Sequence, residues 1–295
     1  MPELSYPIIA IPDLHGQLAW LDSLLTQLRL HEVWPTATLV FLGDLVDRGP
    51  DVRGVVQKVA ELVKEKPGSV CVTGNHDFAL VKAAGLDGEP ENFWVEKYRT
   101  NYDSDRTFLS YLGRAAERHT PEKWVSDIAA LREAMPERHR EFLAGLPWVA
   151  EAAGHVFLHN GLSSELNEPA AIQLHALRQR RWADVVSPKL GTKTFALWQR
   201  HYPVWLGADK RVNADPLPVP GKVQVVGHVQ VPEPDVNGVR VRLDTTGGVW
   251  PPLTAGIFRG AKAPVEFVQG KAQTAGENRR SDFSGASWGS GGEGR

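Results

Sequence analysis

The chain has 295 residues, of which 42% are hydrophobic, so it can bury a sizeable core as one large domain or two small ones. Its 33 basic and 35 acidic residues nearly balance. It therefore lacks the basic excess of a protein that binds nucleic acid by general neutralisation of phosphates. The single cysteine, Cys71, excludes an internal disulfide framework, and its apolar surroundings SVCVTG predict a buried side chain in a reducing compartment.

The N-terminal segment MPELSYPIIAIPD has neither the basic region nor the long apolar run of a signal peptide. Elsewhere, the apolar runs are shorter than the roughly 20 residues that span a bilayer. We therefore expect a cytoplasmic protein with neither a membrane nor a nucleic-acid partner.

The first half of the chain contains two units of strand, loop and helix. Residues 6–11 form a β-branched strand, and residues 18–30 carry leucines at helical spacing. The second unit has a strand at 38–42, the loop GDLVDRGP at 43–50, and a helix at 52–66 with valines along one face.

Further short apolar strands are expected at 69–73, 155–159 and 222–226. Because these strands are almost continuously apolar, we expect a sheet that is covered on both faces.

The C-terminal part is expected to be mostly β. Residues 239–243 alternate Val and Leu with Arg240 and Arg242, which predicts a strand with one polar face. LTAGIF at 253–258 and PVEFV at 264–268 are expected to form further strands.

Residues 85–140 differ from the rest of the chain. They are aromatic and charged, and they predict a helical insert packed beside a domain that spans 1–269. Residues 270–295 are rich in Gly, Ser and charge, so we expect a disordered tail.

Five predicted strands end in clusters of polar ligands. The clusters are PDLHG (12–16), GDLVDRG (43–49), GNHD (74–77), HNG (159–161) and GHV (227–229). Together they bring carboxylate, imidazole and carboxamide groups to one edge of the sheet, which predicts a metal site.

In the first two clusters, Asp13 and His15 project to the same side of an extended segment and can bind one ion, although so short a pattern is often a solvated loop. Asp44 lies nearest its strand end and could bridge two ions. For Arg48 two interpretations stay open: a surface ion pair of little value, or a planar fork that grips two phosphate oxygens.

In the later clusters, Asn75 offers a carbonyl oxygen to a metal and an amide N–H to an anion, and His76 can donate a proton. His159 and His228 each follow an apolar strand directly, and both are expected to bind a second ion. Mixed nitrogen and oxygen ligands suit two ions of Mn, Fe or Zn better than Mg or Ca. The other histidines, such as His31, His119 and His139, are expected on the surface.

This series of clusters resembles, in order and over roughly residues 6–260, the signature of the phosphoprotein phosphatase family of dinuclear metallophosphatases. HNGLSSEL is similar to eukaryotic members, and LDTTGGVWPPLTA resembles bacterial members and the diadenosine tetraphosphate hydrolases. GNHDF together with ERHREFLAGLPWV resembles most the Rhizobiales-like branch. The resemblance implies an αββα fold, a mixed β-sandwich flanked by helices.

The resemblance also implies the set of metal ligands. These are Asp13 and His15 for the first ion, Asp44 as the bridge, and Asn75, His159 and His228 for the second ion. Pro12 replaces the usual glycine of the first motif, but it removes no ligand.

For catalysis the resemblance implies that Asp47 orients His76, the proton donor to the leaving oxygen. Arg48 and Asn75 would hold the phosphoryl group. Arg200, in LWQRHYP, is either a second phosphate-binding arginine or a helix cap. A metal-bridging hydroxide would attack phosphorus directly, without a phosphoenzyme.

The implied activity is that of a protein phosphatase acting on phosphoserine and phosphothreonine in a phosphoprotein or phosphopeptide. Phosphotyrosine is a further hypothesis, because members of the Rhizobiales-like branch have been associated with it. A diadenosine tetraphosphate hydrolase and an inactive phosphate-binding scaffold are the alternatives. Several insert residues could line a substrate cleft or form a helical cap, namely Trp94, Lys97, Tyr98, Arg99, Tyr102, Arg106 and Arg114.

Overall fold

The fold is seen in a computed structural model that describes residues 3–116, 120–162, 164, 168–181 and 216–271. Arg200 and His119 lie outside the described residues, as does all of the predicted tail after residue 271.

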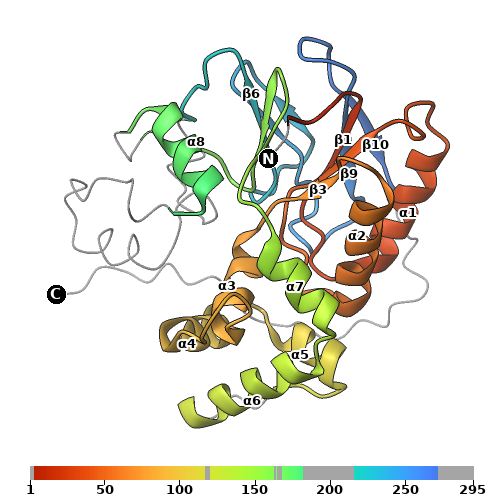
Figure 1. The fold of residues 1–295 in the computed structure, drawn as a ribbon. Coiled ribbons are helices and arrows are strands. Elements are labelled where there is room, and N and C mark those ends of the chain that lie inside the picture. The colour runs from red at the N-terminus through yellow and green to blue at the C-terminus, as the bar shows by residue number, and fades with distance from the viewer. Residues whose placement is uncertain (1–2, 117–119, 163, 165–167, 182–215, 272–295) are drawn as a thin grey trace.

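Two five-stranded mixed sheets form the centre of the molecule (Figure 1). The first has the order β10 (Glu266–Gln269), β9 (Thr254–Phe258), β1 (Ile8–Ile11), β2 (Thr38–Phe41) and β3 (Val70–Cys71). The second has the order β4 (Ala150–Glu151), β5 (His155–Phe157), β6 (Val223–Val226), β8 (Arg240–Arg242) and β7 (Asp235–Val236). The central strands run parallel, and the predicted αββα sandwich is confirmed.

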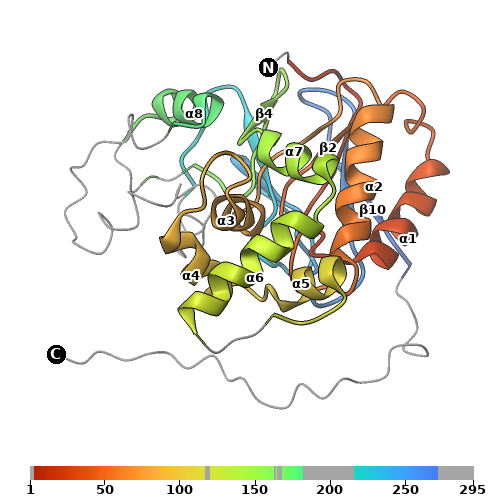
Figure 2. The same ribbon diagram turned by 60° about the horizontal axis from the view of Figure 1, so that its bottom comes forward.

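Helices cover these sheets. α1 (Leu18–Arg29) and α2 (Val52–Glu65) pack on the first sheet, and α8 (Ala170–Gln179) lies beside the second. The remaining helices are α3 (Asn75–Ala84), α4 (Asn92–Asn101), α5 (Asp105–Leu112), α6 (Pro121–Ala134) and α7 (Glu137–Gly145). They gather at one end of the sandwich, as Figure 2 shows most clearly for α4, α5 and α6.

Alternate side chains of the strands enter two separate apolar clusters. Ile8 and Ala10 lie between the sheets, whereas Ile9 and Ile11 face the helices. Both faces of the sheet are therefore buried at β1, β2 and β9, as the continuous apolar strands predict, whereas the edge strand β10 is largely exposed. Cys71 is buried in the helix-facing cluster, again as predicted.

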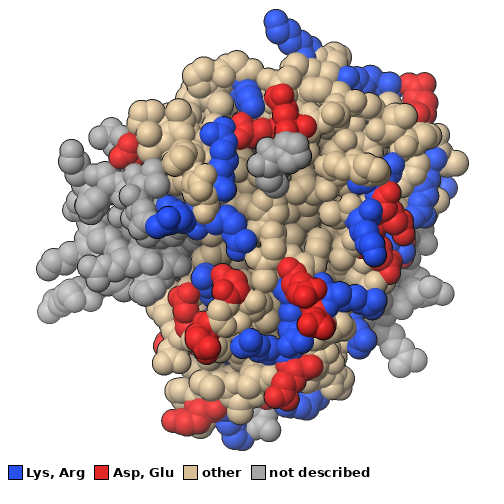
Figure 3. Space-filling model, viewed as in Figure 1, with Lys and Arg blue, Asp and Glu red and all other residues tan. Residues whose placement is uncertain are grey.

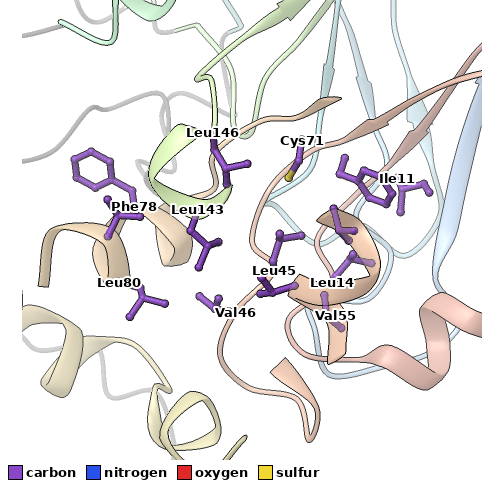
Figure 4. Packing of buried hydrophobic residues seen from close by; sticks show 14 of the residues in the cluster. Ile11, Leu14, Leu45, Val46, Val55, Cys71, Phe78, Leu80, Leu143 and Leu146 are labelled. Atoms are coloured by element: carbon purple, nitrogen blue, oxygen red, sulfur yellow. The ribbon is translucent and has the colours of Figure 1, made fainter. Parts of the chain in front are cut away.

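The loop after β2 is anchored by the two apolar residues between its acids. Leu45 and Val46 are fully buried, and Figure 4 shows them pointing into the cluster between Val55 of α2 and the side chains of Leu80 and Leu143. Burying two such side chains contributes several kcal/mol, on the order of 1.5 to 3 kcal/mol each, which holds the loop in place.

The predicted insert is helical, and much of its aromatic content is internal: Trp94 and Tyr98 are buried. Figure 3 shows basic and acidic side chains interspersed over this end of the molecule. Among the described residues, every helix is too short or too polar to cross a membrane.

Two expectations were wrong. His139 is buried rather than on the surface, because α7 packs its imidazole between Tyr111 and Gln57. Arg240 does not lie on an open polar face, since it is only 1% exposed and its guanidinium packs against Gly161. Burial lowers the pKa of Arg240 to about 10.

Candidate active site

The polar clusters meet on loops at one edge of the sandwich, and their backbone is unusual. Six non-glycine residues of the described chain have positive φ, and five belong to these clusters: His15, Asp44, Asp47, Arg48 and His228. Non-glycine residues adopt such angles at a cost on the order of 1 to 3 kcal/mol. The surrounding packing must therefore impose this conformation, which turns the side chains toward one another.

Asp44 is the centre of the cluster. Its Oδ2 lies 3.4 Å from Nε2 of His15 and 3.4 Å from Nε2 of His159. Its Oδ1 accepts a hydrogen bond of 2.8 Å from the backbone N–H of His76. One carboxylate thus faces two imidazoles from different sheets, which is the position expected of a bridging ligand.

Both imidazoles are oriented by backbone carbonyls. His15 donates through Nδ1 to the oxygen of Val46 at 2.9 Å, and His159 donates through Nδ1 to that of Leu42 at 2.7 Å. These contacts leave Nε2 of each ring directed at Asp44, as is usual for histidines that bind metals.

The other sequence-predicted ligands surround this centre. Asn75 Oδ1 and His228 Nδ1 each lie 3.0 Å from Nε2 of His159. Asp13 accepts a hydrogen bond of 2.9 Å from the backbone N–H of His228, and its other oxygen lies 3.9 Å from Nε2 of His15. The structure therefore brings all six residues predicted as metal ligands together.

Two groups within this cluster have the spacing needed to hold a metal ion. One contains His15, Asp44 and His76, and the other contains Asp44, His159 and His228, so that Asp44 belongs to both. His76, predicted as the proton donor, takes part in the first group, whereas the carboxylate of Asp13 lies slightly further out.

The charges of the site fit a cation. Asp13, Asp44 and Asp244 are almost completely buried near one another. Burial and the neighbouring Asp244 hold the pKa of Asp13 well above its usual range. Burial lowers the pKa of His159, but the carboxylates of Asp44 and Asp13 outweigh it and raise that pKa to about 10. Buried carboxylates in this number require positive charge in contact with them, and metal ions on these nitrogen and oxygen donors would supply it.

Beside this cluster lies a hydrogen-bonded pair. Nδ1 of His76 donates to Oδ2 of Asp47 at 2.7 Å, and both residues are buried. The ring of Tyr102, from the turn after α4, meets His76 edge to face at 4.8 Å. Asp47 is therefore placed to orient His76.

Arg48 reaches across the cluster. Its Nη1 donates to Nε2 of His15 at 2.9 Å and to the carbonyl of Gly247 at 2.7 Å, and its Nη2 lies 3.1 Å from Nε2 of His76. The guanidinium thus points into the site and is not a surface ion pair. Arg200 lies outside the described residues, so its role stays a prediction.

The sequence pattern predicts neither Thr107 nor Asp244 as a site residue, and it predicts Tyr98 only as a residue that lines a substrate cleft or forms a helical cap. Thr107 and Tyr98 contact Asp47 from the insert, and Asp244 lies buried after β8. Asp244 stands at the end of a strand, the same signal that marked the other clusters. Thr107 carries no such signal, because it lies within a helix.

Comparison with known proteins identifies the protein family. The calcineurin-like phosphoesterase family matches residues 6–232, and the chain belongs to this family. It is therefore a hydrolase of the metallophosphoesterase type, in a family that depends on metal ions.

Individual relatives differ in their named substrates. The symmetrical bis(5'-nucleosyl)-tetraphosphatase of Ralstonia nicotianae is 42% identical over 84 residues, which is 28% of each chain. A solved structure provisionally named a diadenosine tetraphosphatase has 23% identity and a TM-score of 0.53, covering 92% of this chain and 96% of its own. The protein-tyrosine phosphatase of a psychrophilic Shewanella has 18% identity and a TM-score of 0.49, covering 91% and 83%.

Proposed function

We propose that this metallophosphoesterase hydrolyses phosphomonoesters on proteins, with two divalent metal ions of Mn, Fe or Zn. The observation that carries the proposal is the arrangement around Asp44, shared by two groups of imidazoles and flanked by Arg48 and the Asp47–His76 pair.

Six residues would hold the metal ions in this proposal: Asp13, His15, Asp44, Asn75, His159 and His228. When bound, the ions would neutralise phosphate charge and lower the pKa of a water molecule so that it can attack phosphorus.

The remaining chemistry belongs to side chains of the chain itself. Arg48 would hold two phosphoryl oxygens with its planar fork, together with the amide of Asn75. His76 would deliver a proton to the departing oxygen from Nε2, while Asp47 fixes its other nitrogen at 2.7 Å and stabilises the positive charge. Without such a donor the departing alkoxide or phenoxide would leave as an anion.

The surroundings of His76 support an aromatic leaving group. Tyr102 is only partly buried and packs its ring against the imidazole of His76 at 4.8 Å. A leaving group that receives its proton from His76 would lie close to this ring. Edge-to-face aromatic contacts contribute on the order of 0.5 to 1.5 kcal/mol, which supports phosphotyrosine among the substrates.

A second candidate is hydrolysis of diadenosine tetraphosphate. It is favoured by the Ralstonia nicotianae relative, which carries that kind of activity in its name. The likeness covers 28% of either chain. Both candidate activities use the same cluster of residues. They differ in the part of the substrate that must bind beside it, a peptide in one case and a dinucleotide in the other.

The experiment is turnover by metal-stripped protein reloaded with Mn²⁺. Matched phosphoserine, phosphothreonine and phosphotyrosine peptides would be compared with diadenosine tetraphosphate. We expect peptide hydrolysis, with phosphotyrosine among the substrates. Preferential cleavage of the dinucleotide would replace the proposal with the second candidate, and no turnover on any substrate would leave a phosphate-binding scaffold.

A further inference from the structure

The carboxylate of Asp47 is completely buried, and its two oxygens have different partners. Oδ2 accepts from His76. Oδ1 accepts two hydroxyl hydrogen bonds, from Tyr98 at 2.6 Å and from Thr107 at 2.5 Å. The hydroxyl of Thr107 also accepts the backbone N–H of Asp47 at 3.1 Å. Both of these hydroxyl hydrogen bonds to Oδ1 therefore come from the helical insert, from Tyr98 on α4 and from Thr107 on α5.

The insert is also tied to this loop through its backbone. The N–H of Arg48 donates to the carbonyl of Asp103, in the turn between α4 and α5, at 3.2 Å. The buried guanidinium of Arg99, on α4, donates to Ser104 in that turn and to Asp105 at the start of α5. These contacts tie together the turn and the two helices that carry the hydroxyl groups.

A buried carboxylate requires donors on both oxygens, and their positions decide how it lies. With Oδ1 fixed by two short hydrogen bonds, the plane of the carboxylate cannot rotate, and Oδ2 stays aligned with Nδ1 of His76. Nε2 of His76 faces the site. Its direction is then determined by the hydrogen bonds that Tyr98 and Thr107 donate to Oδ1 of Asp47.

We propose that Tyr98 and Thr107 are positioning residues for the Asp47–His76 pair, so that the helical insert completes the proton donor. The inference rests on the proposed function, in which His76 protonates the leaving oxygen. Neither hydroxyl touches the metal ligands, and each acts through Asp47.

The test uses the full chain loaded with Mn²⁺, and aryl phosphates whose leaving phenols differ in acidity. A proton donor matters for phenyl phosphate, whose leaving group is poor, and hardly at all for 2,4-dinitrophenyl phosphate. For Tyr98→Phe we expect turnover of phenyl phosphate to fall about 10- to 100-fold, a part of what a general acid supplies, with little change for the dinitrophenyl ester. The rate should thus depend more steeply on leaving-group acidity.

The control is Tyr111→Phe. This tyrosine also lies in the insert, is also buried, and donates its hydroxyl to His139 away from Asp47. In Tyr111→Phe, the rate should depend on leaving-group acidity as weakly as it does in the unaltered protein. Thr107→Val should make the rate depend more steeply on leaving-group acidity, whereas Thr107→Ser, which keeps the hydroxyl, should not. The inference can therefore still be tested if one variant fails to fold.

An equal loss on all aryl phosphates in Tyr98→Phe and Thr107→Val would overturn the inference, because it would show a merely structural role. An unchanged dependence in both variants would also overturn it. Absence of turnover by the unaltered protein on every phosphomonoester would instead overturn the proposed function itself, so the two failures are distinguishable.

Discussion

The loops at the sheet edge and the helical insert build the same site by different means. The loop residues His15, Asp44, Asp47 and His228 have positive φ, at angles of 40°, 52°, 71° and 63°. The insert supplies Tyr98 from an ordinary turn of α4, where its ring is buried.

The difference separates two kinds of contribution. The loops carry groups that must converge within a few ångströms, and backbone strain is the cost of that convergence. The insert carries groups that hold the loop side chains in place, which helices can do without strain. We therefore expect changes in the loops to remove chemistry, and changes in the insert to weaken it or to alter only stability.

The largest effect is expected for Asp44→Asn. This change weakens the oxygen donor that both metal groups share. Since loss of residues that merely support metal ligands costs about 10- to 100-fold, we expect turnover to fall by at least 10³ or so. Bound metal, measured by mass spectrometry of the dialysed protein, should fall as well. Retention of full metal content by Asp44→Asn would show that Asp44 is not a ligand shared by two metal ions.

The second effect is a loss of turnover without loss of metal, expected for His76→Asn. Removing a general acid typically costs about 10² to 10⁴ in rate. Asp13→Asn provides the contrast, because it should lose both turnover and metal. Unchanged rates in both variants would contradict the assignment of this site.

A third comparison places the same substitution in a loop of the site and at the end of α7, just beyond the insert. A Cβ on Gly74, in the loop after β3, would lie 2.1 Å from Oδ1 of Asp44, so Gly74→Ala should destabilise the fold by about 1 to 3 kcal/mol. A Cβ on Gly145, at the end of α7, would meet nothing within 4 Å, so Gly145→Ala should be neutral or stabilising by about 0.5 kcal/mol. Urea unfolding measures both, and equal effects would argue against the tight packing of the loop.

The smallest effect concerns pH and the buried His139. Burial, with a contribution from Arg138 and Arg53, lowers its pKa to about 4 from an ordinary value near 6.5. Between these values the unfolded chain binds the extra proton, so stability is complete above pH 6.5 and falls as the pH drops toward 4. We expect His139 to account for on the order of 1 kcal/mol of this loss.

This pH effect is measured by thermal unfolding at pH 7.5 and pH 5. His139→Gln, which cannot titrate, should lose less stability between the two conditions than the unaltered protein. An identical loss in both proteins would mean that His139 does not cause it.

The sequence predicts that these polar residues converge, because each of them follows an apolar strand; that they bind metal ions stays a prediction. Parallel strands place their carboxyl ends at one edge, so order along the chain is enough to bring Asp13, Asp44 and Asn75 together. His159 and His228 follow neighbouring strands of the second sheet in the same way.

The insert could not be predicted in this way. The contact of Thr107 with Asp47 spans 60 residues and depends on how α5 is rotated about its axis. His139 stands among charged residues in ERHRE and has a surface-like pattern, but α7 packs that face against Tyr111 and Gln57. Tertiary packing decides both cases, and local sequence does not record it.

We propose that two metal ions share Asp44 and that turnover depends on both of them. The most direct test is a titration of metal-stripped protein with Mn²⁺, in which bound metal and hydrolysis of a phosphotyrosine peptide are followed together. We expect binding to level off at two ions per chain, with turnover following the second, and expect Asp44→Asn to abolish this pattern. Full turnover in the presence of a chelator, or identical binding by Asp44→Asn, would contradict the claim.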